Sequence, residues 1–136
     1  MNIKVKLLSI GEPTYGGVIY TKEMANVVVE QFNALKAKSN TILGEFCISD
    51  PFSTSPNGVL MERASHRIEN MWIEDGDLFS EIEVLETQQG RALRSWIDVN
   101  FVIRAVESID DNKAVTSVEF VTVDADALPV LQSFFI

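Results

Sequence analysis

Residues 64–85 read ASHRIENMWIEDGDLFSEIEVL, and this stretch decides how the chain folds. It belongs to two extended segments, Met61–Ile73 and Leu78–Leu85, which are bounded by polar residues as strands usually are. Between them stands Asp75-Gly76, a dipeptide that favours the positive φ angles of a tight hairpin turn. Glutamate alternates with aliphatic residues over 81–84, so we expect one face of the second strand to meet water. The stretch therefore predicts a β-hairpin.

The chain before this hairpin predicts a strand, a helix and a further apolar run. Asn2–Ile10 alternates around three aliphatic side chains and leads into a turn rich in glycine and proline. From Thr21 to Lys38 apolar residues recur every three to four positions, which predicts an amphipathic helix with Thr21 as its N-cap. The apolar run Thr41–Cys47 then precedes residues 49–58, whose serines and prolines predict a loop.

The chain after the hairpin predicts a second helix and a second hairpin. Gln88–Asp98 carries apolar residues at helical spacing. Two extended segments, Phe101–Ile109 and Ala114–Val123, flank the turn residues Asp110-Asp111-Asn112. The tail Leu128–Ile136 is apolar, and we expect it either to dock on the core of its own domain or to sit in a partner.

Composition limits the classes of function. The 136 residues contain no internal repeat or linker, so we expect residues 1–136 to form a single α+β domain of mainly antiparallel strands with two helices. With 11 Lys and Arg against 20 Asp and Glu, the net charge is −9, which disfavours nucleic-acid partners.

No apolar run approaches the roughly 18–20 residues that span a bilayer, and no secretory signal is evident, so we expect neither a membrane protein nor an exported one. One Cys, one His and no glycine-rich phosphate loop lead us to expect no metal and no cofactor.

Few side chains are candidates for chemistry. His66 follows Ser65 on a predicted strand; histidine is the usual base for activating a hydroxyl near neutral pH, and a structural role in the core is the alternative. Cys47 lies in an apolar run, where a thiol usually behaves as a small buried hydrophobe. Five aspartates lie mostly at predicted strand ends and turns, where we expect them to solvate strand ends or bind local amides: Asp98, Asp110, Asp111, Asp124 and Asp126.

The order of the segments resembles the prohead (capsid maturation) protease family of tailed phages, the T-even type in particular. The resemblance is carried, in chain order, by Gly17-Val18-Ile19-Tyr20, Gly44-Glu45-Phe46, Ala64–Trp72, Asp75–Phe79 and Val84–Gly90. It covers most of the chain, from about residue 16 to residue 126. Family members are similar in fold to herpesvirus assembly proteases, so the resemblance implies a small β-barrel flanked by helices.

The chain departs from the family at the catalytic positions. Active members follow their Gly-Glu-Leu closely with a His-Pro pair, whereas residues 44–51 here keep the proline but have no histidine, and Ser49 stands at the degenerate position. Active members also carry a Gly-Val-Ser-Ser-Arg-Gly strand with the nucleophile. If Arg104 fixes the register, Val102 and Ile103 replace the two serines. An aliphatic side chain can neither attack a carbonyl nor accept a proton, so the resemblance implies a protease fold without the protease.

Three hypotheses for function follow from this resemblance. The first is a non-catalytic structural component of the virion, a minor capsid or decoration protein that contacts the major capsid protein or other head proteins and assembles in the host cytoplasm. The second is an inhibitor or regulator of the active prohead protease during head assembly. The third is a diverged active protease in which His66 is the base and Ser65, Ser95 or Ser108 is the nucleophile. A homo-oligomer is compatible with each of them.

Overall fold

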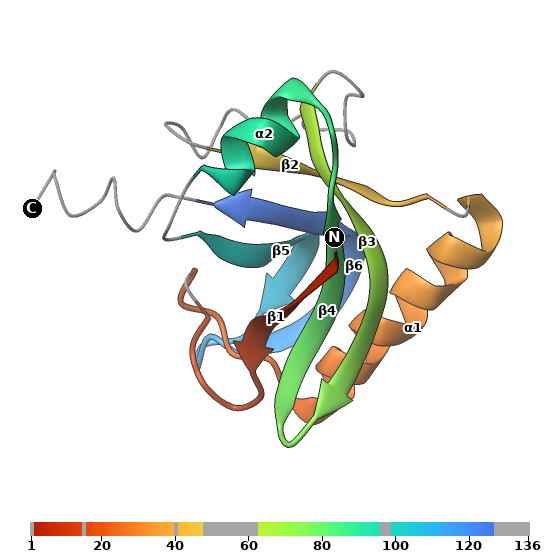
Figure 1. Ribbon diagram of the computed structural model, residues 1–136. Coiled ribbons are helices and arrows are strands. Elements are labelled where there is room, and N and C mark those ends of the chain that lie inside the picture. The colour runs from red at the N-terminus through yellow and green to blue at the C-terminus, as the bar shows by residue number, and fades with distance from the viewer. Residues whose placement is uncertain (1, 15, 40, 48–62, 96–98, 127–136) are drawn as a thin grey trace, which may run out of the picture.

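The computed structural model describes residues 2–14, 16–39, 41–47, 63–95 and 99–126. These residues form six strands and two helices, arranged as one curled sheet with a helix on its side and another at its end (Figure 1). In chain order the elements are β1 (Asn2–Ser9), α1 (Lys22–Ser39), β2 (Leu43–Cys47), β3 (Ala64–Glu74), β4 (Asp77–Val84), α2 (Gln88–Arg94), β5 (Asn100–Ile109) and β6 (Val115–Asp126). The expected α+β fold with two helices is confirmed.

Both predicted hairpins form. The β3–β4 turn has φ angles of 52° at Asp75 and 80° at Gly76, as a two-residue turn of this handedness requires. Along β4 each second residue is buried and the others are partly exposed, which confirms the predicted wet face. In the β5–β6 turn the Asp110 carboxylate accepts hydrogen bonds from the backbone N–H groups of Asn112 and Ala114.

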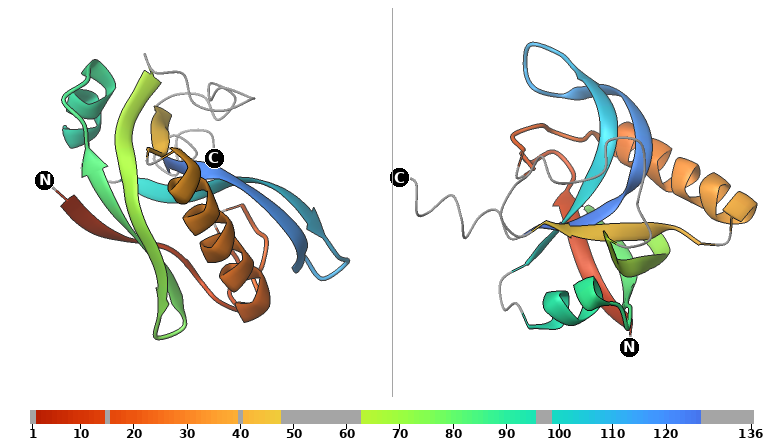
Figure 2. Two further views of the ribbon diagram at one scale, coloured as in Figure 1. Left: turned by 90° about the vertical axis from the view of Figure 1, so that its right-hand side faces the viewer. Right: turned by 90° about the horizontal axis from the view of Figure 1, so that it is seen from above.

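The sheet is mixed and not purely antiparallel. Its strand order is β1-β4-β3-β2-β6-β5, and β2 pairs with β6 in parallel while every other pair is antiparallel. At the register shifts the extra residue lies in β1, β3 or β6, and such bulges increase the local twist of a strand. The sheet therefore curls into a half-barrel, and its two edge strands, β1 and β5, approach each other (Figure 2).

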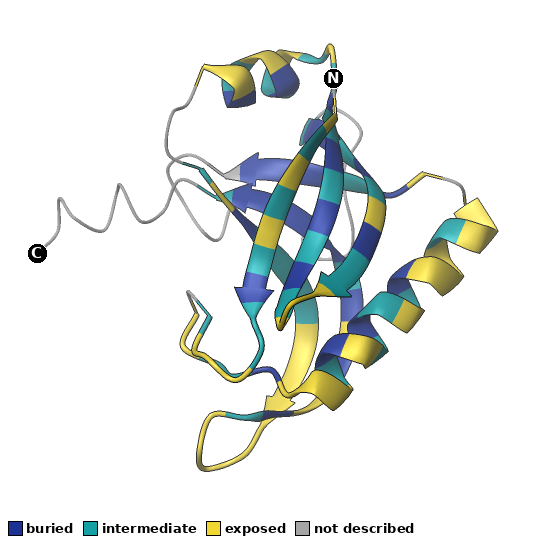
Figure 3. Ribbon diagram, turned by 60° about the horizontal axis from the view of Figure 1, so that its bottom comes forward, coloured by how far each residue is buried: buried dark blue, intermediate teal, exposed yellow. Residues whose placement is uncertain are grey.

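Helix α1 begins and packs as its sequence predicts. Thr21 caps it by accepting a hydrogen bond from the backbone N–H of Met24 at 3.2 Å. Val28 and Phe32 are buried on the face that packs against β3 and β6, and the outer face of the helix is exposed (Figure 3). The Phe32 ring meets the Phe120 ring of β6 edge-to-face, with the centroids 6.1 Å apart. This helix thus covers one side of the half-barrel and leaves the gap between β1 and β5 uncovered.

Helix α2 lies at the end of the sheet beside β3. Thr87 caps it by accepting a hydrogen bond from the Gly90 N–H, and its hydroxyl donates to the carbonyl of Ala64. The described helix ends at Arg94, and residues 96–98 of the predicted helix lie outside the described residues.

Candidate functional site

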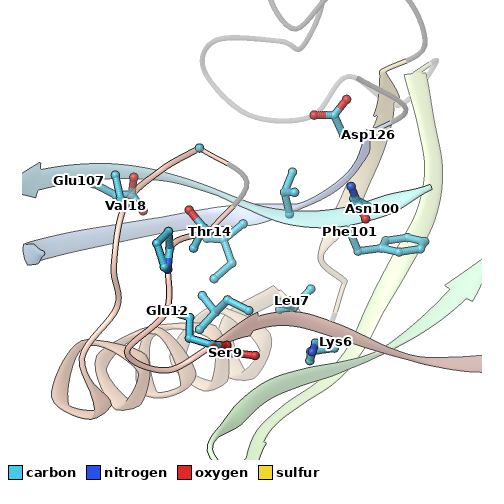
Figure 4. Close-up of a pocket in the computed structure, with 15 residues that line it drawn as sticks. Lys6, Leu7, Ser9, Glu12, Thr14, Val18, Asn100, Phe101, Glu107 and Asp126 are labelled. Atoms are coloured by element: carbon cyan, nitrogen blue, oxygen red, sulfur yellow. The ribbon is translucent and has the colours of Figure 1, made fainter. Parts of the chain in front are cut away.

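A groove separates the two edge strands of the half-barrel. Strands β1 and β5 lie on either side of it, and the chain between Glu12 and Val18 closes one end (Figure 4). Its volume is about 870 Å³. Polar and apolar side chains share its wall, which consists of Lys6, Leu7, Leu8, Ser9, Glu12, Pro13, Thr14, Gly16, Val18, Asn100, Phe101, Val102, Ile103, Glu107 and Asp126. It is large enough to hold several side chains of a peptide.

Val102 and Ile103, the positions that the resemblance assigns to the family's serines, both lie in this wall. They stand side by side on β5, opposite Asp124 and Val123 of β6, and both are partly exposed. The structure therefore places these two positions at the groove, where both side chains are aliphatic.

His66 lies outside the groove, in the core of the sheet. Its side chain is fully buried, and its Nε2 is 2.7 Å from the carbonyl oxygen of Val123. A carbonyl oxygen only accepts hydrogen bonds, so Nε2 carries the proton and Nδ1 is left to accept the hydrogen bond from the Ser65 hydroxyl, 2.7 Å away. Phe101, which lines the groove, packs its ring edge-to-face against the imidazole, with the centroids 5.4 Å apart.

Burial lowers the pKa of His66 below its ordinary value, although the hydrogen bond to Val123 and the charge of Asp124 act in the opposite direction. The imidazole is therefore neutral in the folded protein at pH 7.

Ser65 is fully buried as well, so a substrate has no route to its hydroxyl in this conformation. Of the other two candidate serines, Ser95 lies at the exposed end of α2 and Ser108 on the exposed part of the β5–β6 hairpin.

Glycine at position 44 lets β2 approach the imidazole. A Cβ atom on Gly44 would lie 2.1 Å from Nε2 of His66 and 2.1 Å from the carbonyl oxygen of Val123. No side chain fits in that space, so the close packing of β2, β3 and β6 requires glycine at position 44.

Arg104 joins two segments on which the resemblance rests. Its guanidinium donates hydrogen bonds to Asp124 at 2.8 and 3.0 Å and to Glu45 at 3.0 Å. The Asp124 carboxylate also accepts a hydrogen bond from the Glu45 backbone N–H at 3.1 Å. Burial acts to lower the pKa of Arg104, but the hydrogen bonds and charges of Asp124 and Glu45 outweigh this and raise it.

The interpretation of Asp124 as a carboxylate at a strand end is wrong. Its side chain is buried, because β6 continues to Asp126 and places Asp124 opposite β5 inside the sheet. This ion cluster was not expected from the sequence. Glu45 and Arg104 both lie in segments that resemble the family, so the resemblance draws attention to these two residues. Nothing in the sequence identifies Asp124 as the partner of both.

Tyr20 and Glu107 meet at the closed end of the groove. The Tyr20 hydroxyl donates a hydrogen bond to the carboxylate of Glu107, one of the groove residues. Burial, this hydrogen bond and the neighbouring charge together raise the pKa of the phenol. Tyr20 therefore stays neutral and ties the segment before α1 to β5.

Some predicted features lie outside the described residues: Ser49 and the 49–58 loop, Asp98, and the tail Leu128–Ile136. Cys47 ends β2, but its side chain is not described. Within the described part of the chain, no three or more His, Cys, Asp or Glu side chains gather as they would around a metal ion. The helices described are also too short or too polar to cross a bilayer.

Comparison with known proteins identifies a similar fold. No family model matches the chain, and the search of curated proteins also found no match. Among solved structures, the chain is similar to the bacteriophage T4 capsid assembly protease, gp21, with a TM-score of 0.74 and 19% sequence identity. The match covers 92% of this chain and 80% of the T4 protein. The chain therefore has the fold of a prohead protease, as the order of its segments predicts.

Proposed function

We propose that this protein is a non-catalytic, prohead-protease-like component of a phage head, and that it contacts a head protein through the groove between β1 and β5. The similarity to a capsid assembly protease supports a role connected with head assembly. One observation carries the non-catalytic part of the proposal. At the two groove positions aligned with the family's serines, the wall presents the aliphatic side chains of Val102 and Ile103.

The position of the sole histidine supports the same conclusion. A serine protease needs a base within about 2.6–3.2 Å of a nucleophile that the substrate carbonyl can reach. His66 Nδ1 lies 2.7 Å from the Ser65 hydroxyl, but both side chains are fully buried, so a substrate cannot reach this pair. The groove therefore has a wall suited to binding a chain segment and no histidine to activate a hydroxyl.

A fluorophosphonate probe tests the catalytic part of this proposal. Such probes label the activated serine of a serine hydrolase covalently, so we expect no labelling of the purified protein. Labelling that disappears in Ser65→Ala and in His66→Gln would instead make the protein a diverged active protease.

Co-sedimentation with heads tests the binding part. The purified chain should sediment with proheads or mature heads of the phage that encodes it, and Val102→Asp in the groove wall should weaken this at least tenfold. Val106→Asp is the matched control, because Val106 lies on the same strand, is 66% exposed and does not line the groove. Binding to the active protease in place of heads would favour the regulator hypothesis, and equal binding by both variants would place the contact outside the groove.

A further inference from the structure

Strand β5 is an edge of the sheet without the features that usually prevent further pairing. It is the last strand in the sheet order, and residues 100–109 contain neither lysine nor proline. At both register shifts between β5 and β6 the extra residue belongs to β6, so β5 itself continues without a bulge. Its charged side chains, Arg104 and Glu107, bind groups of their own domain. Exposed edges of this kind recruit another strand, because their backbone N–H and C=O groups are unpaired.

The opposite edge of the sheet, β1, has the usual protection. Lys4 and Lys6 are exposed on it, and Leu7 is the extra residue of a bulge against β4. Lysine side chains and bulges both disfavour pairing with a further strand. Of the two strands that border the groove, β5 is therefore the one suited to pair with an extended chain segment.

The side chains of β5 would select the sequence of such a segment. Residues four apart on a strand lie on the same face, so Ile103 and Glu107 share a face of β5, and both line the groove. Glu107 lies at the closed end, where Glu12 also belongs to the wall (Figure 4). Among the described wall residues only Lys6, on β1, is cationic. A segment paired with β5 would thus meet an apolar side chain and, farther along, two carboxylates.

We propose that the groove takes an extended segment of a head protein as an additional strand beside β5, with an apolar side chain against Ile103 and a lysine or arginine, four positions away, at Glu107 and Glu12. Backbone pairing would supply affinity, and the two side chains would supply specificity. The Glu107 carboxylate accepts a hydrogen bond from Tyr20 and keeps further lone pairs for a cation. This inference deepens the proposed function and rests on it for the identity of the partner.

Synthetic peptides test the inference without any head protein. The heptapeptide Thr-Val-Thr-Val-Thr-Lys-Thr has a valine and a lysine four positions apart on one face of a strand, and a second peptide carries glutamate in place of the lysine. Fluorescence anisotropy should give a dissociation constant about tenfold lower for the lysine peptide. Alternate backbone N–H groups of a strand face opposite edges, so methylation of one alternating set should abolish binding and methylation of the other should not.

Charge reversal in the groove wall locates the contact. In Glu107→Lys the preference should invert, so that the glutamate peptide binds more tightly than the lysine peptide. Glu119→Lys is the matched control, because Glu119 is exposed on β6 and does not line the groove, and this variant should keep the natural preference. Glu12→Lys, which leaves the hydrogen bond between Tyr20 and Glu107 in place, should also reduce the preference and remains informative if Glu107→Lys does not fold.

Four results would overturn the inference. The two peptides bind equally; neither peptide binds; both methylated sets bind as tightly as the parent peptide; or the chain is a dimer that Val106→Asp dissociates, which makes a second copy the strand that β5 recruits. Failure of the proposed function is distinguishable from these results, because it would appear as absent co-sedimentation with heads even where the lysine peptide binds as expected.

Discussion

Removing the Arg104 side chain would leave two buried carboxylates without their cation. Arg104 neutralises two carboxylates, those of Glu45 and Asp124, and its own side chain is only 16% exposed. The penalty for removing one partner from a buried ion pair comes mainly from the charge left behind. The cluster thus fixes β2, β5 and β6 relative to one another.

Replacing Arg104 by Met should reduce the free energy of unfolding by about 3–5 kcal/mol, because Glu45 and Asp124 would stay buried without their cation. Urea denaturation followed by circular dichroism measures this loss. Arg67→Met is the control, since Arg67 bridges Glu69 and Glu83 on a more exposed surface, with 37% of its side chain accessible. Exposed ion pairs contribute under about 1 kcal/mol, so equal losses in the two variants would contradict the structural role of Arg104.

His66 should make stability depend on pH. Its pKa is lowered in the folded protein, so the unfolded chain binds more protons once the pH falls below about 6.5. Stability is then lost as the pH falls, by up to about 1.4 kcal/mol per pH unit from this group. Urea denaturation from pH 7.5 to 5 should show a shallower decline for His66→Gln than for the natural protein. Parallel declines would mean that other groups control the acid sensitivity.

The residues of the candidate site could be named from the sequence, but the contacts that they make could not. The resemblance aligned Val102 and Ile103 with the family's serines, and the structure adds that both line the groove. The pair Ser65-His66 does not show whether His66 is a base or a core residue. Adjacent residues on a strand usually face opposite sides of the sheet, and the sequence does not say which side is buried. The answer depends on Val123, which is 57 positions away in the chain and reaches the imidazole only through sheet pairing.

Among the elements, β2 is the shortest strand and makes the least regular pairings. It pairs antiparallel with β3 and in parallel with β6, and thereby connects the two hairpins into one sheet. Local sequence predicted both hairpins, because their turns are short and carry Asp-Gly or clustered Asp and Asn. The parallel pairing joins residues about 79 positions apart, and no turn signal marks it.

Gly44→Ala tests the central position of β2. The added methyl group would overlap the His66 ring and the Val123 carbonyl, so we expect the free energy of unfolding to fall by more than about 3 kcal/mol, beyond the usual range for overpacking. Gly16→Ala is the matched control, because the nearest atom to its new Cβ would be the Thr14 hydroxyl at 3.9 Å. That change should stay within about 0.5 kcal/mol. Thermal unfolding of the two variants would contradict the account if their midpoints moved together.

The whole molecule is an open half-barrel whose two sheet edges meet across a groove. This arrangement depends on strand order and curl, and a sequence specifies neither directly, since the bulges that bend the strands leave no distinct motif. The resemblance supplied the architecture that local patterns could not. It also predicted which groove positions to compare with an active protease, and the structure places Val102 and Ile103 in the groove wall.

The central claim is that the protein belongs to the head as an intact, non-catalytic component. Quantitative mass spectrometry of purified mature particles tests it most directly, by measuring the copy number of this chain against the major capsid protein together with its intact mass. We expect a fixed ratio and a chain that is uncut within residues 1–136. Absence of the chain, or its presence only as trace fragments, would contradict it and point instead to a regulator that is lost during assembly.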